Sequence, residues 1–103
     1  MKITFVVRLH RHNGDRLGFY VPKSVFEFYE LKAPYGGLNI SGTIEWRSGP
    51  PTESMTGELS KKHELPDIGT KLYEHPNGLR GVIPRWANMP DPGTLVELSI
   101  AVA

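Results

Sequence analysis

The sequence predicts a mainly β domain with short helices, and three observations support this. Apolar and polar residues alternate along several short runs, as expected for strands with one buried face. Clusters of Pro and Gly, which end regular structure, separate those runs. A strand-like run that ends in Pro and a basic residue occurs twice, at Val21-Pro22-Lys23 and at Ile83-Pro84-Arg85. We therefore expect one small domain (residues 1–103) built from two similar halves.

Composition narrows the class of protein. The chain has 103 residues, of which 39% are apolar and 22% charged, enough for one modest core. It has no Cys, which excludes disulfides and thiolate chemistry and is typical of a cytoplasmic protein. No apolar run is long enough for a membrane span, and the N-terminal segment becomes charged too soon for a signal peptide. The net charge is only +1, so nucleic-acid binding would require basic residues gathered on one face.

The N-terminal segment predicts a β-hairpin. Residues 3–9 alternate, with a turn signal at Asn13-Gly14 and a return strand over residues 16–22. A two-residue Asn-Gly turn would pair Arg8 with Phe19 and mix the polar and apolar faces. Pairing Leu9 with Phe19 keeps the apolar residues together, so we predict a longer or bulged loop.

The next segment predicts a short helix. Ser24 and Glu27 have capping-box spacing, in which each side chain satisfies a free backbone N–H, and this indicates a helix over about residues 25–32. Pro84–Met89 has room for one helical turn. A flexible loop is expected at about 47–54, and further strands are expected at 38–46, 55–60, 70–74, 79–83 and 94–102.

The two halves, at about 3–46 and 70–103, share one order of features. Each has a strand, a Pro-basic pair, a helical insert, a glycine and an alternating strand, and Gly37 corresponds to Gly93. The agreement in order, spacing and strand phase favours an internal duplication of a ββαβ unit. Chance similarity is the alternative, because strand–Pro–turn sequences are common in β proteins.

The repeated phrase, at Tyr20–Gly37 and Val82–Leu98, resembles the strand–Pro-Lys–helix–Gly–strand element of the AbrB/SpoVT-like swapped-hairpin family. In that family two such elements from two chains interleave into one barrel. Two elements in one chain resemble the fused, cradle-loop barrel arrangement. The resemblance implies a six- to seven-stranded barrel and a non-enzymatic, double-stranded-DNA-binding regulator of transcription. A duplicated chain should be monomeric, with a homodimer as the alternative.

Basic residues near the first hairpin and the paired prolines are the candidate nucleic-acid contacts. Arg and Lys neutralise backbone phosphates and supply most non-specific affinity. Lys23 and Arg85 follow the two prolines, so they would occupy equivalent places in a two-halved barrel. The alternative interpretation of the basic residues of the first hairpin is that they form a solvated surface, whose charged edge protects the hairpin against aggregation. The candidates are Arg8, His10, Arg11, His12, Arg16, Lys23 and Arg85.

Other chemistry has weaker sequence support. Trp86, in a short turn, is a candidate for ligand stacking, although aromatic residues more often pack in a core. His10 and His12 would bind a metal only with a third ligand such as His63 or His75, so surface histidines are the favoured interpretation. No nucleophile, phosphate-loop or acid–base motif is found, so we expect neither an enzyme nor a cofactor. The alternative function is a barrel module that binds a small ligand or a protein.

Overall fold

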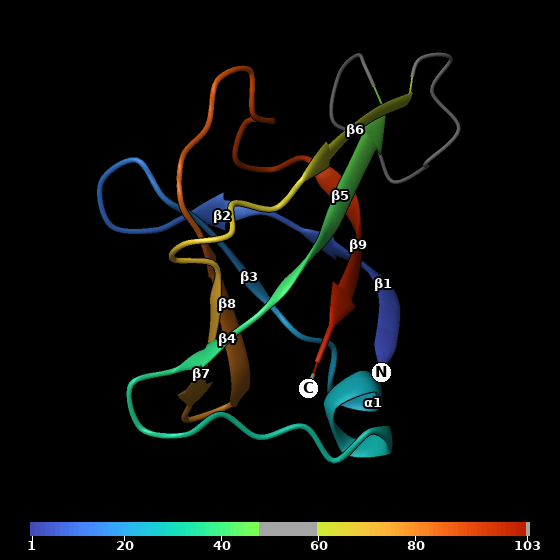
Figure 1. Cartoon of the computed structure of the whole chain (residues 1–103), viewed down its shortest axis with the longest axis vertical. Helices are drawn as coiled ribbons and strands as arrows, with labels where there is room; N and C mark the ends of the chain where they lie inside the picture. The colour runs from blue at the N-terminus through green and yellow to red at the C-terminus, as the bar shows by residue number, and fades with distance from the viewer. Residues whose placement is uncertain (48–59, 103) are drawn as a thin grey trace.

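A computed structural model gives the fold and describes residues 1–47 and 60–102. The described chain is mainly β, with two antiparallel sheets and one short helix (Figure 1). The elements are β1 (Lys2–Arg8), β2 (His10–Arg11), β3 (Leu17–Tyr20), α1 (Lys23–Phe28), β4 (Leu38–Asn39), β5 (Ser41–Arg47), β6 (Ser60–Glu64), β7 (Lys71–His75), β8 (Gly78–Ile83) and β9 (Leu95–Ala101). One sheet has the order β1-β9-β5-β6 and the other the order β2-β3-β8-β7-β4.

Two bends carry the chain from one sheet to the other. At Leu9, β1 leaves β9 and continues as β2, and at Ile40 the chain passes from β4 to β5. Gly42, just after the second bend, has φ +147°, and a Cβ there would lie 1.9 Å from the Ser99 carbonyl oxygen. Because the bends interrupt the pairing, the strands form two sheets. We predicted a closed or nearly closed barrel of six to seven strands, and the described strands form two sheets that do not close into a barrel.

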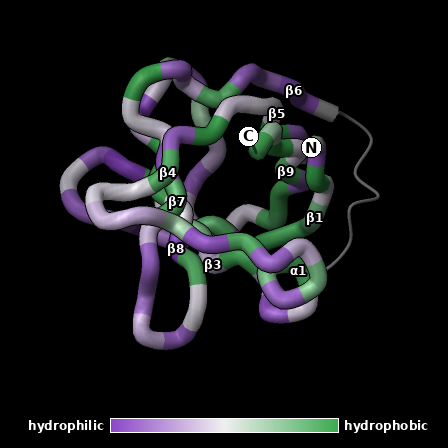
Figure 2. The backbone as a smooth tube through the Cα atoms, turned by 60° about the horizontal axis from the view of Figure 1, so that its bottom comes forward, coloured by the Kyte–Doolittle hydropathy of each residue, from purple (hydrophilic) through white to green (hydrophobic). Residues whose placement is uncertain are grey.

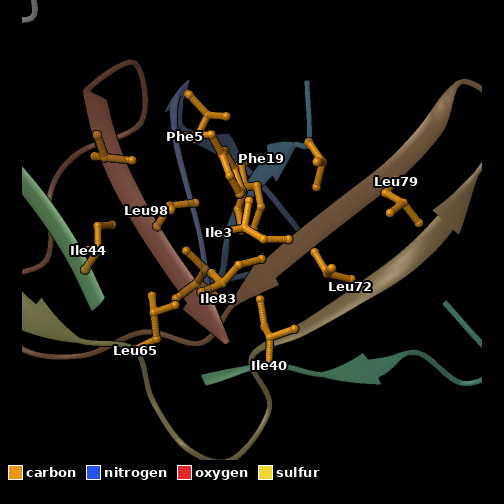
Figure 3. Packing of buried hydrophobic residues seen from close by; sticks show 14 of the residues in the cluster. Ile3, Phe5, Phe19, Ile40, Ile44, Leu65, Leu72, Leu79, Ile83 and Leu98 are labelled. Carbon is orange, nitrogen blue, oxygen red and sulfur yellow. The ribbon is translucent and has the colours of Figure 1, made fainter. Parts of the chain in front are cut away.

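The core lies between the two sheets (Figure 3), where labelled side chains from both sheets point toward one another. Val96, Leu98 and Ile100 of β9 are all 0% exposed, as their alternation predicted. The Phe19 ring lies against Gly81, where a Cβ would be 2.0 Å from the Phe19 Cζ atom. The core therefore depends on a large and a small residue placed opposite each other.

The two ends of the described chain meet at the edge of the four-stranded sheet. The Met1 amino group donates to the Val102 carbonyl oxygen at 3.1 Å, and the Val102 N–H donates to the Met1 carbonyl oxygen at 2.9 Å. Figure 2 shows the N and C labels close together, with the hydrophilic strand β6 at the other edge of this sheet.

Most of the predicted strands are confirmed, but the predicted pairing of residues 3–9 with residues 16–22 is wrong, because β1 pairs with β9 instead. Only the two positions next to the loop pair as a hairpin, and they do so in the predicted register. His10 pairs with Gly18 and Arg11 with Leu17, which is the register that brings Leu9 toward Phe19. The loop is longer than two residues, since the His12 N–H donates to the Arg16 carbonyl oxygen at 3.0 Å. The predicted strand at 55–60 and loop at 47–54 lie outside the described residues, except for Ser60 in β6 and Arg47 in β5.

The helix predictions are partly wrong. α1 begins at Lys23 and ends at Phe28, and no side chain caps it, because the N-cap residue is Pro22, which has no polar side chain, and Ser24 lies inside the helix. The helical turn predicted within Pro84–Met89 is absent, and Asn88 takes φ +62°, which a right-handed helix excludes. Within the described ranges, no helix is long and apolar enough to cross a membrane.

Candidate functional site

The outer face of the five-stranded sheet gathers cationic and aromatic side chains. Leu17 and Phe19 point into the core, so the residues between and after them point outward, and the pairing registers extend this face across the other strands. We call this set the sheet face. Its members are His10, Gly18, Tyr20, Asn39, Lys71, Tyr73, His75, Arg80 and Val82. None of these residues carries a carboxylate.

Arg80 lies at the centre of the sheet face. Its cross-strand neighbours are Tyr20 on one side and Tyr73 on the other, so the three side chains form one row. The guanidinium carbon lies 5.6 Å from the centroid of the Tyr20 ring, within the range of a cation–π contact. Nη2 lies 3.3 Å from Nε2 of His10, whereas Nε is buried and has no hydrogen-bond partner among the described residues. The contacts with Tyr20 and His10 therefore hold the Arg80 guanidinium in place on the sheet face.

The rings beside Arg80 form a packed group. The His10 and Tyr20 rings stack with centroids 4.9 Å apart at 19°, and the His75 ring meets Tyr20 edge-on at 5.2 Å. Gly18 makes this possible, because a Cβ there would lie 2.5 Å from the His10 Nε2 atom. The His10 ring therefore packs directly on the backbone of β3 at Gly18.

The electrostatics of the sheet face disfavour additional positive charge. Burial, and then the nearby charges of Arg80 and His12, lower the pKa of His10. Burial, Arg80 and Arg16, in that order, lower the pKa of His12. Both imidazoles are therefore neutral near neutral pH, and a bound anion would offset the charge that keeps them so.

A cavity of about 260 Å³ opens beside Arg80. It is lined by His12, Arg16, Tyr73, Glu74, His75, Arg80 and Val82, and we call it the Arg80 cavity. The Glu74 carboxylate is engaged away from the sheet face, where its Oε1 accepts a hydrogen bond from the Ala33 N–H at 3.2 Å. The polar side chains left to face the cavity are two arginines, one tyrosine and two imidazoles.

A second cavity, also about 260 Å³, lies between the first hairpin and the loop that follows β8. Its lining includes Arg11, Arg16, Arg85 and Trp86. Arg85 Nη1 donates to Oδ1 of Asp15 at 3.0 Å, and both side chains are largely exposed. Because Arg16 lines both cavities, the basic surface runs from the sheet face onto the hairpin loop.

The structure divides the predicted basic residues into those near this surface and those elsewhere. His10, His12, Arg11, Arg16 and Arg85 lie on the sheet face or around the two cavities. Arg8 and Lys23 lie on other surfaces of the molecule.

Arg8 and Lys23 are separated from the site for different reasons. Arg8 lies on the four-stranded sheet, where its Nη1 donates to the Gly93 carbonyl oxygen at 2.7 Å. Lys23 begins α1 at the opposite end of the β3–β8 pair from Arg85, because these strands run antiparallel (Figure 1). Lys23 and Arg85 consequently do not share one groove.

Trp86 is half-buried and packs against the core. The His63 ring stacks on it at 4.9 Å and 22°, and Trp46 meets it at 6.3 Å and 64°. These contacts fit the core interpretation, and ligand stacking by Trp86 stays a prediction. Residues 1–47 and 60–102 contain no group of three His, Asp or Glu side chains placed to hold a metal ion.

Sequence reasoning missed Arg80. The alternation of residues 79–83 predicts that Arg80 points outward, and this was its only local signal. Its place between two tyrosines depends on the pairing of β8 with both β3 and β7. The aromatic residues of the sheet face gave no distinct signal either, since tyrosines in strands are common.

Comparison of the chain with protein-family models, curated proteins and solved structures gives no match. The resemblance to the AbrB/SpoVT-like family therefore stays a prediction based on the two short motifs, and the function has to be argued from the site.

Proposed function

We propose that the chain is a non-enzymatic nucleic-acid-binding protein that contacts its ligand through the sheet face. The observation that carries this proposal is the row of Tyr20, Arg80 and Tyr73, in which a guanidinium lies between two aromatic rings on a face without carboxylates. Guanidinium groups bind phosphates, and aromatic rings stack on bases. A DNA-binding transcription regulator, as the family resemblance implies, is one specific form of this proposal.

Charge segregation supports the proposal despite the net charge of +1. The carboxylates of Glu27, Glu30 and Glu74 lie around a groove beside α1, away from the sheet face. Four arginines line the two cavities, against the carboxylates of Asp15, Glu74 and Asp91. Asp15 is paired with Arg85, and Glu74 accepts a hydrogen bond from the Ala33 N–H. Such a surface attracts a polyanion and accelerates its association.

A salt-dependent binding titration tests the proposal. We expect labelled DNA or RNA to bind at low salt and to lose affinity as salt rises, because binding releases counterions. Arg80→Gln should weaken binding about tenfold and reduce the salt slope by about one. Lys2→Gln, which removes a charge from the exposed start of β1, is the matched control and should change neither. Affinity that is undetectable at low salt, or insensitive to salt, would contradict the proposal.

The alternative function, binding of a small ligand or protein, has one observation in its favour. A groove of about 610 Å³ lies between α1 and the β7–β8 turn, with Phe26, Leu31 and Leu79 among its lining residues. Its carboxylates would favour a cationic ligand. Binding that is lost in Glu30→Gln and retained in Arg80→Gln would favour this alternative over nucleic-acid binding.

We also propose that the fold is a single-chain relative of the cradle-loop barrel, formed by duplication. The corresponding glycines have the same left-handed backbone, with φ +93° at Gly37 and +95° at Gly93. Corresponding strands also pair with each other, β3 with β8 and β5 with β9. In the second pair Thr43 lies opposite Ser99, its own counterpart in the repeat. These relations are those expected of two halves related by a twofold axis.

A further inference from the structure

We infer that the ligand is single-stranded nucleic acid, with one phosphate bound in the Arg80 cavity and unpaired bases on the neighbouring rings. This inference rests on the proposed function and names its substrate class. Three features carry it: the chemistry of the cavity, the exposure of the rings on a sheet, and the continuity of the basic surface.

The Arg80 cavity has the chemistry of a phosphate subsite. Arg16 and Arg80 line the cavity and supply fixed positive charge. His12, His75 and the Tyr73 hydroxyl can each add a donor. The one carboxylate among the lining residues, that of Glu74, is held by the Ala33 N–H. A ligand that satisfies this set must bring acceptors and negative charge, as a phosphate does.

The row of Tyr20, Arg80 and Tyr73 favours unpaired bases over a duplex. Tyr20 is 48% exposed although its ring is held by His10 and His75, so it offers a rigid surface to a ligand. In a duplex the faces of the bases are stacked on one another, and only an unpaired strand can place them on protein rings. Aromatic side chains on a sheet are a recurrent platform for such bases.

The structure offers little that would enter the groove of a duplex. Duplex DNA is read by a helix or a two-stranded ribbon in the major groove. α1 has six residues, has no basic residue in its last turn and lies at the far end of β3 from the hairpin loop. The ribbon formed by β2 and β3 has only two paired positions before its loop, so only a short ribbon is available to enter a groove.

The basic surface gives the strand a path beyond the first phosphate. Arg16 stands between the two cavities, and Arg11 and Arg85 line the second one. A strand anchored at Arg80 would therefore pass Arg16 and continue toward Arg85. A path that passes both cavities requires several nucleotides, because their arginines lie on the sheet face and around the hairpin loop.

The test compares one oligonucleotide in two forms. A labelled single strand of about 12 nucleotides and its duplex with the complement are titrated by fluorescence anisotropy at the same salt concentration. We expect the single strand to bind at least about tenfold more tightly than the duplex, since stacking on exposed rings is open only to the single strand. Inorganic phosphate at high concentration should compete with the single strand in the wild-type protein and compete less in Arg80→Gln.

Two variants of Tyr20 distinguish a loss of base stacking from a loss of the fold. Tyr20→Leu should weaken single-strand binding about tenfold, whereas Tyr20→Phe, which keeps the ring, should retain it. Urea unfolding of each variant shows whether the fold persists, and the Tyr20→Phe result stands even where Tyr20→Leu unfolds. Equal losses in Tyr20→Phe and Tyr20→Leu would overturn the stacking role.

The outcomes distinguish this inference from the proposed function. Tighter binding of the duplex than of the single strand would overturn the single-strand inference and leave nucleic-acid binding intact. Absence of binding by both forms at low salt would overturn both. Single-strand binding that is unchanged in Arg80→Gln would overturn the phosphate subsite.

Discussion

At the scale of single residues, two glycines decide where aromatic rings lie. Gly81 makes room for Phe19 inside the core, and Gly18 makes room for His10 on the sheet face. The consequences differ, because Phe19 is fully enclosed while the His10 side chain can move outward. A substitution at Gly81 should therefore affect stability, and one at Gly18 should mainly displace the His10 ring from Tyr20.

Gly81→Ala is expected to destabilise the fold by about 1–3 kcal/mol, the usual cost of overpacking a core. The added Cβ would lie 2.0 Å from Phe19 Cζ, so the ring must leave its position. Urea unfolding followed by Trp fluorescence measures the loss. If the clash is the cause, Gly81→Ala combined with Phe19→Leu will cost less than the sum of the single changes. Additive costs would show that the two positions are independent.

Acidification is expected to reduce stability through His10. Its pKa in the folded chain is lowered from the ordinary value of 6.5, first by burial and then by Arg80 and His12. The groups around it are Arg80 of β8, Tyr20 of β3, His75 of β7 and His12. As the pH falls below the ordinary value, the unfolded chain binds protons before the folded chain does. Stability present above pH 6.5 is therefore lost, until the pH has passed below the lowered pKa of the folded state.

Urea midpoints at pH values from about 7.5 down to about 5 test this expectation. The midpoint should fall over that range, and it should fall less in His10→Gln, which cannot take up the proton. His12→Gln should show a smaller rescue of the same sign, because the pKa of His12 is lowered too. An identical acid response in the wild-type protein and both variants would contradict a role for these imidazoles.

At this scale the sequence predicted which residues point outward but not which of them meet. His10 and His12 were recognised as basic candidates, and the structure places them near Arg80 and Arg16. The contact between His10 and Arg80 joins residues that are 70 positions apart, and no local pattern contains that information. Local alternation specifies a face, whereas the partners on that face follow from strand order.

At the scale of elements, alternation was a reliable guide to strands and a poor guide to their interruptions. The run at residues 38–46 was predicted as one continuous strand, and the structure divides it at Ile40 into β4 and β5. The strand predicted at residues 3–9 is confirmed as β1, and the other bend follows it at Leu9. The constraint at Gly42 is the carbonyl oxygen of Ser99 in β9, a strand that pairs with β5 but is distant from it in sequence. The capping-box prediction failed because the helix begins at Lys23 with Pro22 as its N-cap, so Ser24 is not at the N-cap and Glu27 is not at the third helical position.

The first hairpin loop carries an ion pair that should restrain binding more than it stabilises the fold. Arg85 and Asp15 are 64% and 72% exposed, and pairs of this kind contribute less than about 1 kcal/mol. Asp15→Asn should leave the urea midpoint almost unchanged. It should also strengthen DNA binding severalfold, because it removes a carboxylate from the basic surface and releases Arg85. Asp67→Asn, at an exposed position between β6 and β7, is a matched control and should have no effect on binding. Weaker binding by Asp15→Asn would show that Asp15 supports the site.

At the scale of the whole molecule, the mainly β class was predictable, but the separation into two sheets was not. Composition and alternation favour a β-rich chain with a single core, and the buried residues agree with that. Closure of a barrel depends on bend angles and on the register between strands that are distant in sequence. The segregation of charge is equally invisible in a net value of +1, because it arises when strands from both halves are set side by side.

The proposed duplication predicts a monomer. The corresponding strands β3 and β8, and likewise β5 and β9, already pair within one chain, so no strand from a second copy is needed. Sedimentation velocity over a wide concentration range should show one species of monomer mass. A dimer that persists on dilution, with strands exchanged between chains in a crystal structure, would contradict this expectation.

The meeting of Met1 with Val102 bears on the order in which the molecule forms. β1 pairs, among the described strands, only with β9, and Thr4 and Ser99, which hydrogen-bond across this pair, are 95 positions apart. Such pairing joins residues that are distant in sequence, and proteins rich in these contacts fold slowly. During synthesis the apolar face of β1 therefore lacks its partner until β9 has left the ribosome. Lys2, Thr4 and Arg8 on the other face, which also carries Val6, would keep the unpaired strand in solution.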